Sequence, residues 1–223
     1  MGIMRIAVDG PAGAGKSTIA KKAAKMLGID YIDTGAMYRA IALKLFRTGT
    51  DYNDPEALAA LLADTDVDFT GGSIYLDGEN VDGLIRTQEV SEMASASSAV
   101  QAVRDKLVAL QQAMGRRKSL IMDGRDIASK VFPDAELKFY VTASSQVRAE
   151  RRAADMAALG QPSDVDQIRE EIEARDYRDM HRANSPLVRV DDAILIDTSN
   201  SSLDETMEEV MGYVREFMNG KGK

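Results

Sequence analysis

The sequence predicts an α/β fold, in which helices cover both faces of a parallel sheet. The first observation is an alternation, because helical patterns separate short apolar stretches at residues 4–8, 31–33, 120–122, 137–141 and 193–196. Strands that alternate with helices are typical of parallel sheets, since a crossover must bring each strand back in the same direction. The second observation is that the first stretch runs into a glycine-rich loop and then into a helical pattern.

One region interrupts the alternation and predicts an insert. Residues 67–70 and 73–77 flank Gly71-Gly72, which predicts a hairpin with a glycine turn. Val81 and the pair Leu84-Ile85 are expected to add a third strand. The expected boundaries are 38–104 for the insert and, for the core around it, 1–37 and 105–223.

The composition excludes several kinds of chemistry. The chain has no cysteine, so disulfides, thiol nucleophiles and cysteine-ligated zinc are excluded. With one histidine, His181, it also has no histidine-rich metal site and no obvious nucleophilic triad. The formal net charge of −8 disfavours nucleic acid and anionic membranes as partners. No apolar run approaches the ~18 residues of a membrane span, and a strand begins at Met4. We therefore expect a cytoplasmic protein, acting as a monomer.

Residues 10–17 satisfy the phosphate-loop pattern G-x-x-x-x-G-K-[ST]. Glycines let successive N–H groups point at phosphate oxygens, and the helix that follows adds the positive end of its dipole. Lys16 is expected to reach the β- and γ-phosphates of a nucleoside triphosphate, and the Ser17 hydroxyl to bind Mg²⁺. Asp33 and Asp123 each end a strand, so each is a candidate either to organise the Mg²⁺ through water or to cap a helix. The residues expected to bind the triphosphate are Gly10, Pro11, Ala12, Gly13, Ala14, Gly15, Lys16, Ser17 and Thr18.

Three classes of protein use such a loop, and a kinase for a small acceptor fits best. No asparagine is followed by lysine, which the guanine-reading tetrad of a switch GTPase requires, and an ATPase motor would need further coupling domains. The acceptor should be anionic, because 12 of the 17 arginines lie in residues 101–189 and guanidinium groups suit phosphate. Arg39 and Arg125 follow strands at the expected binding edge of the sheet.

Six stretches together resemble the bacterial cytidylate kinase family over nearly the whole chain. The most specific are residues 85–90, Ile-Arg-Thr-Gln-Glu-Val, and residues 123–126, Asp-Gly-Arg-Asp. The others are residues 10–18, 33–39, 131–135 and 175–179. The resemblance implies a P-loop kinase that transfers the γ-phosphoryl group of ATP to CMP or dCMP in pyrimidine nucleotide metabolism. It also implies that the insert binds the nucleoside monophosphate and that a short helical lid lies at about 145–165.

The resemblance further implies roles for individual residues. The acceptor phosphate would be held by Thr34, Arg39 and Arg125, with Arg182 nearby and Tyr38 in the acceptor pocket. Cytosine would be read by Ser95, Arg104 and Asp126, and the sugar contacted by Arg175 and Asp179. The lid would contact ATP through Arg148, Arg151 and Arg152. Charge on the transferring group would be neutralised by Lys16, Arg39, Arg125 and Arg182.

One stretch departs from the family. Ala128-Ser129-Lys130 follows Ile127 where the family usually has Gly-Thr, which leaves open how Asp126 is presented. Three alternatives also stay open: another nucleoside monophosphate kinase, for UMP/CMP or AMP, a shikimate-type kinase without the hairpin insert, or a nucleotide-binding regulator without turnover.

Overall fold

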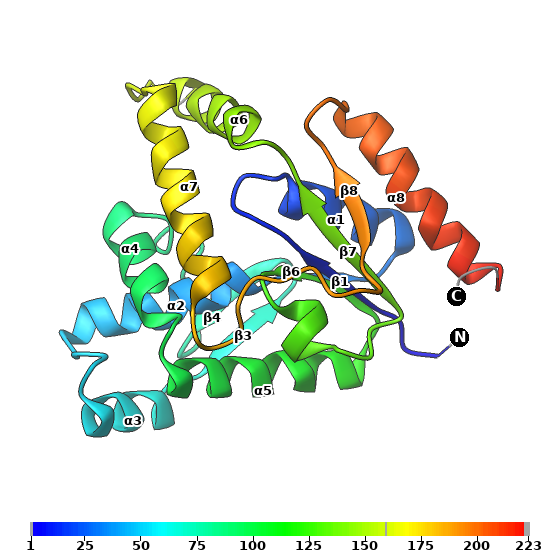
Figure 1. The fold of residues 1–223 in the computed structure, drawn as a ribbon. Helices are drawn as coiled ribbons and strands as arrows, with labels where there is room; N and C mark the ends of the chain where they lie inside the picture. Colours follow the sequence, from blue (N-terminus) through cyan, green and yellow to red (C-terminus); the bar gives the residue numbers. More distant parts are fainter. Residues whose placement is uncertain (1, 159, 221–223) are drawn as a thin grey trace. The chain divides into compact units, whose positions relative to one another are not determined.

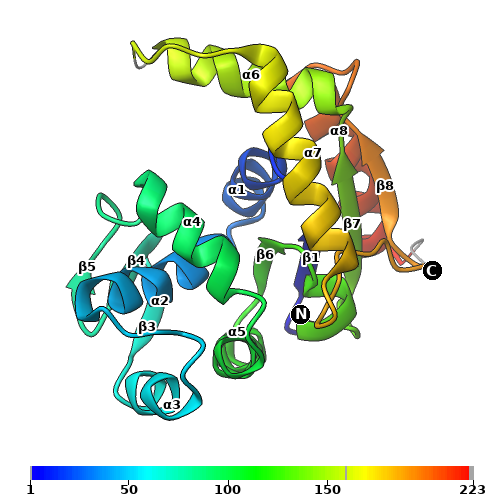
Figure 2. The ribbon, with the colours of Figure 1, turned by 60° about the vertical axis from the view of Figure 1, so that its left-hand side comes forward.

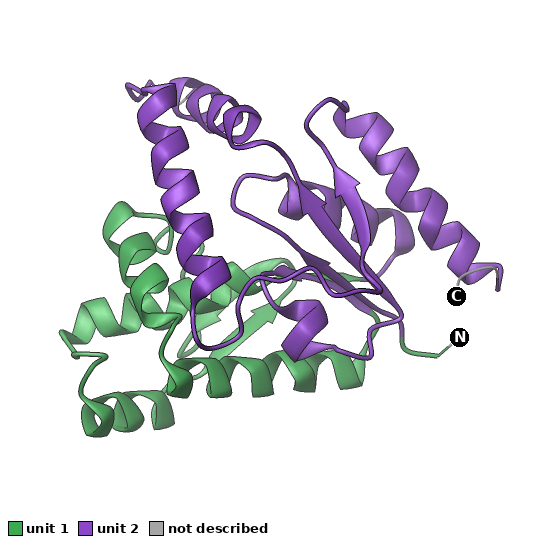
Figure 3. Cartoon of the chain, viewed as in Figure 1, with its two compact units in different colours: residues 1–3, 30–119 green, residues 4–29, 120–223 purple. Residues whose placement is uncertain are grey.

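The computed structural model describes residues 2–158 and 160–220 (Figure 1). The chain divides into two compact units (Figure 3). Unit 1 comprises residues 1–3 and 30–119, and unit 2 comprises residues 4–29 and 120–223. The expected insert, residues 38–104, lies inside unit 1.

The strands of unit 2 confirm the predicted parallel sheet. They are β1 (Arg5–Asp9), β6 (Leu120–Gly124), β7 (Leu137–Thr142) and β8 (Ile194–Asp197). These four of the larger sheet's five strands are parallel neighbours in the order β6-β1-β7-β8. Four of the five residues of β1 are buried, as expected for an inner strand covered on both faces. Asp9 lies in register with Gly124 and Tyr140, so the carboxyl ends of three strands meet at one edge.

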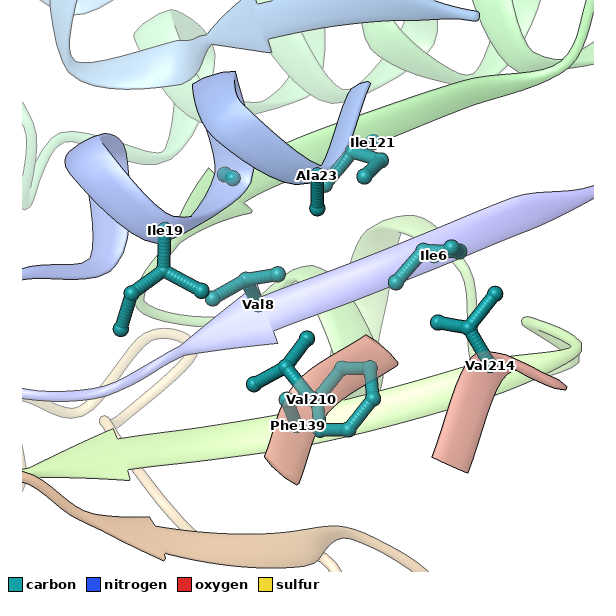
Figure 4. Close-up of a pocket in the computed structure, with 9 residues that line it drawn as sticks. Ile6, Val8, Ile19, Ala23, Ile121, Phe139, Val210 and Val214 are labelled. Carbon is teal, nitrogen blue, oxygen red and sulfur yellow. The ribbon is translucent and has the colours of Figure 1, made fainter. Parts of the chain in front are cut away.

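The helices of unit 2 are α1 (Lys16–Leu27), the π-helix η1 (Ile127–Val131), α6 (Ser145–Ala158), α7 (Val165–His181) and α8 (Leu203–Met218). Of these, α1, η1 and α8 pack on the sheet, whereas α6 and α7 pack on each other. Figure 4 shows Ile19 of α1 and Val210 of α8 close to Val8 of β1, within an apolar layer on one face of the sheet. A capping box of Ser202 and Glu205 starts α8. Within the described ranges, no helix combines the length and apolarity needed to cross a bilayer.

The expected lid segment, residues 145–165, contains α6 and ends where α7 begins. Helices α6 and α7 lie side by side (Figure 2), joined through a small apolar cluster that includes Ala149, Ala153, Ile168 and Ile172. Residues 160–164 lie between the two helices, and Leu159 lies outside the described residues. Asp164 caps α7 by accepting from the N–H groups of residues 166 and 167.

Unit 1 holds the second, antiparallel sheet. Its elements are β2 (Asp30–Asp33), α2 (Thr34–Thr48), α3 (Pro55–Ala63), β3 (Val67–Thr70), β4 (Ser73–Leu76), β5 (Glu79–Asn80), α4 (Gln88–Ser97) and α5 (Gln101–Arg117). The strands lie in the order β3-β4-β5, and Gly71-Gly72 forms the predicted turn. Alternate residues of β3 and β4 are buried, which explains the hairpin pattern in the sequence.

The predicted third strand of the insert was wrong in its position. The strand is β5, whereas Val81, Leu84 and Ile85 lie in a turn in which Leu84 and Ile85 donate to the Val81 carbonyl. Val81 and Ile85 are fully buried and lie four residues apart. That spacing puts both side chains on one side of a helical turn, so they fill the core without a strand.

Candidate functional site

The phosphate loop has the predicted setting, between the end of β1 and the start of α1. Gly10 and Gly13 have φ of 144° and 76°, which favour glycine. A Cβ on Gly10 would lie 1.9 Å from the Val141 carbonyl oxygen, and one on Gly13 would lie 3.3 Å from Cβ of Arg148. The loop therefore passes too close to β7 for any residue larger than glycine at position 10.

The carbonyl groups of the loop are held by side chains. Lys16 Nζ donates to the Pro11 carbonyl at 2.6 Å, and Thr198 Oγ1 donates to the Ala14 carbonyl at 3.2 Å. Arg148 Nη1 donates to a third loop carbonyl, that of Ala12, at 3.0 Å. The N–H groups of Gly13 and Gly15, in contrast, have no acceptor among the described residues. With its carbonyls turned toward donors, the loop leaves amide groups for an anion.

Lys16 is almost fully buried, at 6% exposure. Burial lowers the pKa of Lys16 to about 7, and the positive charge of the nearby Arg125 adds to this shift. The negative charges of Asp123 and Asp9 act in the opposite direction. An anion bound beside the ammonium group would favour its charged form. The site is thus electrostatically suited to a phosphate group.

The two carboxylates predicted for Mg²⁺ have different local partners. Ser17 Oγ donates to Asp123 Oδ2 at 2.8 Å, so a hydroxyl and a carboxylate oxygen lie together at the start of α1. Asp33 instead caps α2, accepting from the Ala36 N–H at 2.9 Å, and lies 3.4 Å from Arg39 Nη2. Oxygen ligands of this kind suit Mg²⁺, which commonly takes one or two protein ligands together with water and phosphate. The residues present at Ser17 and Asp123 fit the ion.

Unit 2 brings together the predicted acceptor residues that it contains. Arg125 Nε donates to Asp179 Oδ2 at 2.9 Å, which joins the loop after β6 to α7. Arg182 Nη2 lies 3.8 Å from Asp126 Oδ1, and Arg175 is near enough to Lys16 to help lower its pKa. Three arginines and two carboxylates from distant parts of the sequence therefore meet beside the phosphate loop.

Unit 1 contains the remaining predicted acceptor residues. The Arg104 guanidinium lies over the Tyr38 ring, 5.6 Å from its centroid, and donates to the Ser98 carbonyl at 3.1 Å. Thr34 is buried at the start of α2, and Ser95 is half-buried on α4, the helix that packs on α2. Helices α2, α4 and α5 thus gather the predicted base-reading and pocket residues of this unit.

The lid arginines divide into two kinds. Arg148 and Arg151 are engaged with the protein: Arg148 donates to Asp176 Oδ2 at 2.6 Å, and Arg151 donates to Thr198 Oγ1 at 3.0 Å and to its carbonyl at 2.7 Å. Arg152 is exposed. Their predicted contact with ATP stays a prediction, but in this structure Arg148 and Arg151 brace the phosphate loop.

The departure from the family pattern lies in the π-helix. Residues 128–130 are within η1, and among the described non-glycine residues only Asp77 and Ser185 have positive φ. The turn after Asp126 therefore requires no glycine.

Sequence reasoning missed three residues of this region: Asp9, Asp176 and Thr198. Asp9 is 1% exposed and accepts from the N–H groups of Ile127 and Ala128. Burial raises the pKa of Asp9 to about 6, although these hydrogen bonds oppose the shift. The available signal was a carboxylate directly after the apolar run at residues 6–8.

Comparisons with known proteins point to one family. The family model described as cytidylate kinase matches residues 6–216. A cytidylate kinase of Symbiobacterium thermophilum is 46% identical over 215 residues, which cover 94% of this chain and 95% of the relative. One of Clostridioides difficile is 44% identical over 214 residues, covering 96% and 99%. A solved shikimate kinase from Bacteroides thetaiotaomicron, 13% identical, covers 96% of this chain and 99% of its own with a TM-score of 0.51, a likeness of fold alone.

Proposed function

Since the chain belongs to the cytidylate kinase family, we propose that it transfers the γ-phosphoryl group of ATP to CMP or dCMP, giving ADP and CDP or dCDP. The structural observation that carries the proposal is the phosphate loop, with its held carbonyls and buried lysine, beside a cluster of arginines. A shikimate-type kinase is disfavoured because such an enzyme was expected to lack the hairpin insert, and the hairpin is present.

On the donor side, the loop amides and Lys16 bind the phosphates of ATP. Ser17 and Asp123 would hold Mg²⁺, directly or through water, and the bound ion would neutralise phosphate charge. We further propose that Arg148, Arg151 and Arg152 of α6 contact ATP, and that Arg148 and Arg151 also hold the loop in shape. Exclusion of water by the segment at 145–165 would prevent wasteful hydrolysis of ATP.

On the acceptor side, the substrate is itself a strong nucleophile. A phosphate monoester has a second pKa of about 6 and is largely dianionic at neutral pH, so transfer needs no general base. This agrees with a chain whose one histidine, His181, is exposed and stacks on Tyr177. Catalysis then consists of alignment and charge neutralisation, for which we assign Lys16, Arg39, Arg125 and Arg182.

Recognition of the nucleoside follows from hydrogen-bond polarity. Cytosine carries an N4 amino donor where uracil carries an O4 acceptor. We assign Asp126, with Ser95 and Arg104, to the base, because a carboxylate accepts from the amino group and repels the uracil oxygen. The remaining assignments are Thr34 and Tyr38 to the acceptor phosphate pocket, and Arg175 and Asp179 to the sugar.

A coupled assay of ADP release tests the proposal. The purified protein is supplied with ATP and Mg²⁺, and CMP, dCMP, UMP, AMP and shikimate are compared as acceptors. We expect the highest kcat/KM with CMP or dCMP, and omission of Mg²⁺ should abolish turnover. Preference for another acceptor, or no release above the ATP-only control, would refute the assignment. We also expect a monomer in solution, which sedimentation would test, acting in the cytoplasm, where ATP is available.

A further inference from the structure

The carboxylate proposed to read the acceptor base occupies an unusual backbone position. Asp126 is the residue immediately before η1, the N-cap position, yet its side chain makes no capping hydrogen bond. Aspartate is among the residues that most readily cap a helix from this position. Something else must therefore satisfy the first N–H groups of η1, because unsatisfied buried amides are strongly disfavoured.

Asp9 performs this capping from another strand. Its Oδ1 accepts from the Ile127 N–H at 2.9 Å, and its Oδ2 accepts from the Ala128 N–H at 2.7 Å. Both oxygens are thus occupied by the first two amides of η1. The side chain is 1% exposed at the end of β1, so it is shielded from solvent.

The Asp126 side chain is left for a different partner. Its Oδ1 lies 3.8 Å from Nη2 of Arg182, a residue already placed among the acceptor-binding arginines. The backbone at Asp126 is anchored from the other side as well, since its carbonyl accepts from the N–H groups of Lys130 and Val131. The position of Asp126 is therefore set by η1, and the position of η1 is set by Asp9.

We propose that Asp9 is a positioning residue for acceptor recognition: by capping η1 in place of Asp126, it keeps the Asp126 carboxylate directed at the acceptor base. The inference rests on the proposed cytidylate kinase activity and deepens it. Asp9 acts through Asp126 and does not itself contact a substrate. Asp9 also directly precedes Gly10, the first residue of the phosphate loop. The experiment must therefore distinguish positioning of Asp126 from support of the phosphate loop.

The experiment is a double-mutant cycle with Asp9→Asn and Asp126→Asn, measured at pH 7.5. An amide at position 9 turns an NH₂ group toward one backbone N–H, so the cap is broken with almost no change in volume. The readouts are kcat/KM for CMP and for UMP, and the KM values for CMP and ATP. Asp9→Ser, which keeps one acceptor in a smaller side chain, provides the same comparison if the asparagine variant does not fold.

We expect Asp9→Asn to lower the CMP-over-UMP ratio by about tenfold and to raise the KM for CMP more than that for ATP. The double variant should discriminate no worse than Asp126→Asn alone, because both changes remove the same directed carboxylate. Asp54→Asn is the matched control: Asp54 caps α3 by accepting from two N–H groups, at 3.0 and 3.1 Å, and should leave the ratio unchanged.

Two results would overturn the proposal. One is an Asp9 variant with a normal CMP-over-UMP ratio and equal rises in both KM values, which would make Asp9 a support of the phosphate loop only. The other is a multiplicative loss of discrimination in the double variant, which would mean that the two carboxylates act independently. Failure of the proposed function is distinguishable, since the wild-type protein itself would then not phosphorylate CMP.

Discussion

Replacement of Arg148 by methionine tests how the phosphate loop is supported. Arg148 is 6% exposed and joins three segments: its Nε donates to the Ala143 carbonyl, and its Nη1 donates to both the Ala12 carbonyl and Asp176 Oδ2. Methionine fills much of the same volume and removes every one of these donors. The change therefore isolates the polar contacts from the packing.

The expected loss of stability follows from the burial of the ion pair. The side chains of Arg148 and Asp176 are 7% and 9% exposed, and the other oxygen of the carboxylate, Asp176 Oδ1, already lacks a hydrogen-bond partner within the described residues. Removing one member of a buried pair leaves an uncompensated charge and costs about 3–5 kcal/mol. With a urea m-value of about 2 kcal/mol/M, the unfolding midpoint should fall by roughly 2 M.

Urea unfolding without ATP is the assay, with Arg152→Met as the matched control. Arg152 lies on the same helix but is exposed, so its replacement should change the free energy of unfolding by less than about 0.5 kcal/mol. A double replacement, Arg148→Met with Asp176→Leu, should recover much of the loss because no buried charge remains. If Arg148→Met is as stable as Arg152→Met, the buried pair does not support the loop.

Three further predictions concern the loop and its neighbours. Lys16→Ala should stay folded by circular dichroism but lose at least about a hundredfold in kcat for ADP release, and normal turnover would refute the role of Lys16. Gly10→Ala should lower the melting temperature by about 5 °C or more, because its Cβ would lie 1.9 Å from the Val141 carbonyl oxygen; an unchanged melting temperature would contradict the close approach. The pKa of Asp9 is raised from 3.8 to about 6, so between these values the folded state binds more protons than the unfolded state. Stability should therefore fall by about 3 kcal/mol in total as pH rises from about 3 to about 7, and Asp9→Asn should remove this slope in pH-dependent unfolding.

Features encoded by neighbouring residues were predictable from the sequence. The phosphate loop, the apolar strands and the glycine-turn hairpin each follow from a local pattern, and the structure confirms them. The prediction of the third strand of the insert was wrong because Val81 and Ile85 are buried on one side of a helical turn. A short apolar run does not distinguish a buried helical turn from a strand. The local sequence also could not show which of Asp33 and Asp123 caps a helix and which is placed to bind a metal ion, because both residues end a strand.

Residue types at fixed short spacings were enough to predict the class of fold, the phosphate loop and the family. Which polar groups meet depends instead on how distant parts of the chain pack together. Asp9 caps a helix 118 residues away, and Arg148 reaches the Ala12 carbonyl across 136 residues. The reason is that a buried amide or carboxylate pairs with whichever polar group the fold brings near it. Sequence spacing does not predict which group that is.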